Sequence, residues 1–188
     1  MRRLLRPHKR GWKLMTFNLS FVQIVALAVA VLACGFDIRQ HRIPNWITFG
    51  SAAAGLSYHL AAGGGSGLFS SAGGWFIGVA MFALPFVLGG LGAGDVKLVA
   101  ALGAWFGPVD TVWLGLYVGV SGGLIALGVA LTRGYLRRAV RNIRLLLMHW
   151  RIAGLRAHPE LTIDSPTAPK LAYGVSILAG TLITVWLR

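Results

Sequence analysis

Apolar residues in this chain come in long unbroken runs, not in the spaced stripes of an amphipathic helix. Hydrophobic residues make up 56% of the 188 positions and charged residues only 12%, about half the charged share of a soluble domain. Such runs are typical of membrane spans. Only helices and closed barrels satisfy their backbone in lipid, and these runs do not alternate with a period of two. The sequence therefore predicts an all-α, polytopic transmembrane helical bundle.

We expect about six membrane helices. The apolar segments cover residues 17–36, 47–62, 75–91, 96–106, 112–131 and 171–187. The Gly/Ser-rich stretch Gly63–Gly74, between the second and third segments, is expected to be a flexible loop. We assign residues 17–188 to a single transmembrane domain without internal repeats, and residues 1–16 to a separate basic arm.

The formal net charge is +13, and the basic residues cluster in the N-terminal arm and between Arg133 and Arg156. No nucleic-acid recognition motif accompanies this charge, so we expect contact with anionic membrane lipid and not with nucleic acid. Within the loop of residues 133–169, apolar residues recur at helical spacing with arginines mostly opposite them. This pattern predicts a basic amphipathic helix on the membrane surface.

The distribution of Lys and Arg predicts the topology. The loops after the first, third and fifth spans hold eleven of these residues, and the other side holds seven, six of them before Met15. The majority places the loops with eleven in the cytoplasm. The basic N-terminal arm contradicts this assignment, and a product that begins at Met15 would remove the contradiction.

Two of the five acidic residues, Asp37 in FDIRQHRIPN and Asp95 in GAGDVK, lie at the edges of apolar runs. A carboxylate at the centre of a membrane helix costs about 2.5–3.5 kcal/mol on insertion scales. Each of the two lies beside a segment marked by Pro or Gly, so the pair predicts a shared polar site inside a membrane protein. The remaining acids, Asp110, Glu160 and Asp164, have no motif around them, and we expect no catalytic role for them.

Other interpretations of the single motifs remain open. Asp95 is also suited to capping the helix that follows it, and Asp37 taken alone fits a charged interfacial loop. His41 and His59 are expected to be interfacial or packing residues, because no ligand spacing indicates a metal site.

Together, the two motifs resemble those of the prepilin peptidases, also called type IV leader peptidases, which are membrane aspartic proteases of the GxGD type. The first match is Asp37 with the following Arg42-Ile43-Pro44-Asn45. The second is Gly92-x-Gly94-Asp95-x-Lys97-Leu98. Near the end, the segment Lys170–Gly180 is similar to the closing segment of that family, although Ala172 stands where proline is usual.

The resemblance implies that Asp37 and Asp95 are the catalytic pair, at the cytoplasmic face of the bacterial inner membrane. It implies supporting or substrate-positioning roles for Arg42, Pro44, Asn45, Gly92, Gly94 and Lys97. The implied substrates are type IV prepilins or pseudopilins, cut after the glycine that ends a short basic leader, for pilus or secretion assembly. No inserted domain follows the first span and no SAM-binding glycine signature is present. The chain therefore looks like the short form of tight-adherence (Flp) pilus systems, with peptidase activity and without methyltransferase activity.

Peptide hydrolysis by two carboxylates needs one ionised group to activate water and one protonated group for the leaving amine. Like charges in one low-dielectric site favour that division, and no metal or cofactor is required. The sequence does not assign the two roles. Three alternatives remain: a proton- or ion-coupled transporter that uses the intramembrane aspartates, a non-enzymatic membrane scaffold, and a GxGD protease with other membrane substrates.

Overall fold

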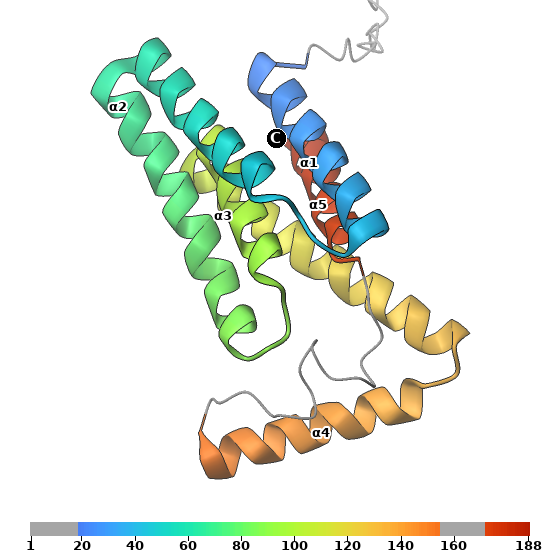
Figure 1. Ribbon diagram of the computed structural model, residues 1–188. Helices are drawn as coiled ribbons and strands as arrows, with labels where there is room; N and C mark the ends of the chain where they lie inside the picture. The colour runs from blue at the N-terminus through green and yellow to red at the C-terminus, as the bar shows by residue number, and fades with distance from the viewer. Residues whose placement is uncertain (1–18, 155–171) are drawn as a thin grey trace, which may run out of the picture.

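The computed structural model describes residues 19–154 and 172–188, and all the regular structure within these ranges is helical. The helices are α1 (Phe21–Gln40), α2 (Asn45–Val87), α3 (Ala93–Thr132), α4 (Leu136–Ala153) and α5 (Gly174–Leu187) (Figure 1). Three of them, α1, α2 and α3, are long and apolar enough to cross a membrane. The predicted all-helical bundle is confirmed. The basic arm, the choice between Met1 and Met15, and the connector after α4 lie outside the described residues.

The described residues form five helices including the surface helix α4, and not the predicted six membrane helices with a further surface helix. The count is lower because α2 and α3 each join two of the predicted apolar segments across one glycine. The second and third predicted segments, and likewise the fourth and fifth, are each joined by a single non-helical glycine. The stretch Gly63–Gly74 is helical apart from Gly64, with φ 59° and ψ −145°. Gly107, with φ 75° and ψ −179°, likewise interrupts α3.

Both long helices fold back at these glycines (Figure 1). A straight helix of the 43 residues of α2 would be about 65 Å long, twice the hydrocarbon thickness of a bilayer. A positive φ reverses the chain there without strain, because glycine has no Cβ. Within α2 and within α3, two predicted apolar segments are thus joined by one glycine and not by a loop.

Side chains from α2 satisfy the carbonyl groups that the break in α3 leaves free. Pro108 has no backbone N–H, so it cannot donate to the carbonyl group of Ala104 four residues earlier. The Ser71 hydroxyl donates to that oxygen instead, over a buried distance of 2.6 Å. The ring Nε2 of His59 lies 2.9 Å from the carbonyl oxygen of Trp105, which can only accept. His59 is thus a packing residue, as predicted.

We expect Ser71→Ala to lower the free energy of unfolding by about 1 kcal/mol, the range of interhelical hydrogen bonds in membrane proteins. The reason is that the Ala104 carbonyl group loses its partner. The matched control is Ser66→Ala, which removes an exposed bond to the Gly63 carbonyl oxygen. Unfolding midpoints in detergent would measure both. An equal loss in the two variants would show that the buried bond has no special role.

Small residues allow the two arms of α2 to pack closely on the first arm of α3. A Cβ atom added at Gly78 would lie 2.8 Å from the Cα atom of Ala100, and one at Gly55 would lie 3.2 Å from the backbone of Ala104. Close backbone approach of this kind is a common basis of helix association in lipid. It fixes the first turns of α3, where Asp95 lies.

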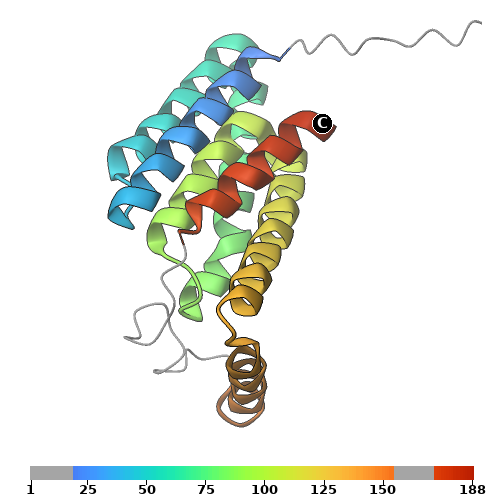
Figure 2. The same cartoon turned by 90° about the vertical axis from the view of Figure 1, so that its right-hand side faces the viewer.

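The predicted amphipathic helix is confirmed as α4, which lies across one end of the bundle (Figures 1 and 2). Its apolar side chains Val140, Ile143 and Leu147 are exposed. The last turn of α1 and the first turns of α3 and α5 point toward this same end (Figure 1). This end is called the α4 end below. Lipid binding by α4 stays a prediction.

Candidate active site

Asp37 lies in the last turn of α1, inside the helix and not in the loop after it, because α1 continues to Gln40. The helix ends where His41 adopts a left-handed conformation, with its N–H bonded to the Asp37 carbonyl oxygen. The Asp37 side chain is only 8% exposed. Its Oδ2 atom accepts a hydrogen bond of 2.7 Å from the backbone N–H of Gly174.

Asp95 lies in the first turn of α3, which begins at Ala93, two residues before the acid. Its Oδ2 atom accepts a hydrogen bond of 3.1 Å from the backbone N–H of Gly92. That N–H belongs to the group of donors at a helix start that have no partner within the helix. The prediction that Asp95 caps a helix starting after it is wrong in its position, because Gly92 is the cap residue and Asp95 lies inside the helix, from where its carboxylate accepts from the cap residue. At 9% exposure, the side chain is also buried, so capping does not exclude a second role.

The structure brings Asp37 close enough to Asp95 for its charge to act on the Asp95 carboxylate. Residues around them join the two motifs as well. A Cβ atom at Gly94 would lie 3.3 Å from the Ile43 Cβ atom, so glycine at this position permits close packing of the first motif on the second. The structure therefore brings the two motifs together, and their catalytic assignment remains a proposal.

A second contact between the motifs lies further from the acids. The Nζ atom of Lys97 donates to Oδ1 of Asn45 over 3.0 Å. Lys97 lies two residues after Asp95, so the two side chains leave α3 on different sides. A direct action of Lys97 on Asp95 is therefore not supported. Its hydrogen bond instead ties the start of α2 to the start of α3.

The remaining predicted residues shape the backbone around the acids. Pro44 precedes the first residue of α2 in an extended conformation and ends the short linker from α1. A Cβ atom at Gly92 would lie 3.2 Å from the Asp95 Oδ2 atom, so glycine leaves room for that carboxylate. Arg42 is exposed, and among the described residues no salt bridge joins it to either acid.

The start of α5 belongs to the site, and sequence reasoning did not assign it a role. Gly174 donates to Asp37, and Tyr173 lies near enough to Asp95 to interact with its charge. The Tyr173 ring packs on α3 at Gly122, where an added Cβ atom would lie 3.0 Å from the tyrosine oxygen. The sequence feature that could have indicated this role is the pair Tyr173-Gly174, within the closing segment that resembles that of the family.

Two buried carboxylates that lie near one another can share one proton and position a water molecule. Among the described residues, neither Asp37 nor Asp95 forms a salt bridge, and Arg188–Asp110 is the pair that does. The backbone donors of Gly92 and Gly174 instead hold one oxygen of each acid. Within the described part of the chain, Oδ2 of each acid is the oxygen that accepts a hydrogen bond. This arrangement fits general acid–base work on a neutral substrate better than a structural ion pair.

A model of the type IV leader peptidase family matches residues 24–127 of the chain. The matched region begins within α1 and ends within α3, so it contains both aspartate motifs. No curated protein and no solved structure shows a significant match.

Proposed function

Because the chain belongs to the type IV leader peptidase family, we propose that it is a membrane aspartic endopeptidase acting on type IV prepilins or pseudopilins. It removes their short basic leader by cutting after the glycine that ends it. The observation that carries this proposal is the proximity of the buried Asp37 and Asp95 side chains, which come from two different motifs and lie near enough for the charge of Asp37 to act on Asp95.

The proposed reaction uses both acids. The ionised carboxylate takes a proton from water as the water oxygen bonds to the peptide carbonyl carbon. The protonated carboxylic acid then gives its proton to the amide nitrogen as the carbon–nitrogen bond breaks. The products are a leader with a new carboxylate and a pilin with a new amine. After proton exchange, the pair returns to its singly protonated state.

We propose that the α4 end faces the cytoplasm. It carries the arginines of α4 together with Arg39 and Arg42, and basic residues are enriched in cytoplasmic loops. At the opposite end, Arg188 is paired with Asp110 at 3.0 Å. A substrate whose basic leader lies in the cytoplasm would then meet the two acids at the membrane edge. This orientation suits processing before pilus or secretion machinery assembles the pilin.

The proposal predicts cleavage of a leader-bearing prepilin by the purified protein in detergent. Mass spectrometry of the product should place the new N-terminus directly after the leader glycine. Added S-adenosylmethionine should leave its mass unchanged, because we propose peptidase activity without methylation. The matched substrate carries valine in place of that glycine, and we expect its cleavage to be lost.

Two results would contradict this proposal. Efficient cleavage of the valine substrate would show that the protease acts on other membrane proteins. No cleavage of any prepilin, together with proton or ion flux in liposomes, would favour the transporter.

A further inference from the structure

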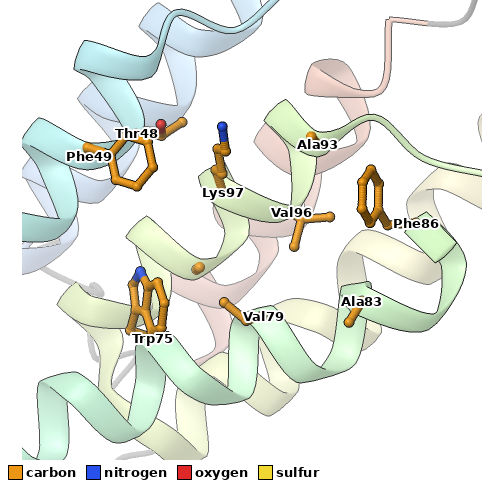
Figure 3. A pocket seen from close by; sticks show the side chains of 10 residues that line it. Thr48, Phe49, Trp75, Val79, Ala83, Phe86, Ala93, Val96 and Lys97 are labelled. Atoms are coloured by element: carbon orange, nitrogen blue, oxygen red, sulfur yellow. The ribbon is translucent and has the colours of Figure 1, made fainter.

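A hollow of about 320 Å³ lies between α2 and the first turns of α3 (Figure 3). We call it the Lys97 groove. Both arms of α2 and the first turns of α3 form its walls, with Thr48, Phe49, Trp75, Val79, Ala83, Phe86, Ala93, Val96, Lys97 and Ala100. Neither proposed catalytic acid lines it. The groove is therefore distinct from the pair of acids, although Ala93 and Val96 of its lining flank Asp95 in the first turn of α3.

The lining is apolar except at one end. Lys97 is the only charged residue among the described residues that line the groove. Figure 3 shows its amino group next to Thr48 and Phe49, pointing away from Val79. The charge therefore sits at one end, and the rest of the groove offers hydrocarbon surface to an occupant.

Lys97 keeps its positive charge available to a ligand. Its amino group donates to the neutral Asn45 side chain at 3.0 Å and lies 5.2 Å from the centre of the Phe49 ring. In the part of the chain that the structure describes, no carboxylate pairs with it. An ammonium group at a membrane edge without a counter-ion favours an anionic partner, and basic pockets between membrane helices bind lipid headgroups.

The distribution of charge in the groove favours a lipid over a transmembrane helix. A phospholipid carries an anionic headgroup at one end of an apolar chain, and the groove has Lys97 at one end of an apolar wall. An acyl chain can lie along this wall between Trp75 and Phe86.

We propose that the Lys97 groove binds an anionic phospholipid, with one acyl chain along its apolar wall and the phosphate against the Lys97 ammonium group. Lys97 then has a role besides its contact with Asn45. A bound lipid would bridge the start of α2 and the start of α3, which carry the two motifs. This inference does not depend on the proposed protease activity.

The test uses the full chain in lipid nanodiscs that contain a photoactivatable phosphatidylglycerol or the matching phosphatidylcholine, each with the reactive group in an acyl chain. Mass spectrometry locates the labelled residues. For wild type we expect labels at Trp75 and Val79, with about fivefold preference for phosphatidylglycerol, the contribution of one lysine at an anionic surface. Lys97→Met should remove this preference, and Lys97→Arg should keep it.

Two comparisons control the experiment. Arg39→Met removes an exposed charge at the same end and should leave the preference intact. Unchanged labelling by phosphatidylcholine in Lys97→Met would show that the groove still forms. Equal labelling of wild type by the two lipids would overturn the proposal. So would equally strong labelling at the exposed Val120 and Leu124.

Discussion

Asp37→Asn and Asp95→Asn are each expected to lower prepilin cleavage by at least about 10³-fold, the scale of losing an acid–base group that acts as part of a unit. Asparagine keeps the size of the side chain, and its carbonyl oxygen can still accept from the Gly174 or Gly92 N–H. It cannot take or give the proton that the reaction needs. Conversion of a co-expressed prepilin, followed by gel shift and mass spectrometry, measures the loss.

Asp110→Asn is the matched control for these two variants. Asp110 lies in α3, is 38% exposed and pairs with Arg188, far in sequence from either motif. We expect it to retain wild-type cleavage. The double variant of Asp37 and Asp95 should lose little more than either single one, because the two act together. Full activity in either single variant would contradict the aspartic protease interpretation. The scaffold and the transporter would then be the remaining alternatives.

The local sequence was enough to predict that Asp37 and Asp95 lie near one another. Asp37 and Asp95 each end an apolar segment beside helix-breaking residues, and the cost of a carboxylate in lipid leaves a shared polar site as the simple solution. The amphipathic pattern of α4 was equally informative, because arginines and apolar residues separate at helical spacing. These features depend on neighbours within a few residues.

Features that depend on packing were missed. The composition of Gly63–Gly74 indicates a loop, yet it is helical because α2 packs on α3 along its length, and Gly64 alone makes the turn. The direction of the Lys97 side chain also depends on where α3 begins. The bond from Gly174 to Asp37 joins residues 137 positions apart, and no local pattern encodes such a distance.

That bond leads to the second large effect: Gly174→Ala should lower kcat for prepilin cleavage by about 10–100-fold, with KM little changed. An added Cβ atom would lie 3.0 Å from both Cβ and Oδ2 of Asp37 and 3.2 Å from the Cα atom of Cys34. The start of α5 or the Asp37 side chain must then move by a few tenths of an ångström. Misplacement of a catalytic group by about 1 Å can cost 10²-fold in rate.

A loss of activity in Gly174→Ala could come from a less stable fold or from a displaced Asp37 side chain, and the experiment has to separate the two. Gly123→Ala is the matched control, since a Cβ atom there meets nothing within 4 Å, and it should keep full activity. Overpacking costs about 1–3 kcal/mol of stability, so Gly174→Ala should remain folded in detergent. If it cleaves at the wild-type kcat, the Gly174 N–H does not position Asp37. A loss that appears only as a lower unfolding midpoint would assign Gly174 to packing. A lower kcat in a folded protein, absent from Gly123→Ala, would make the start of α5 a third part of the site.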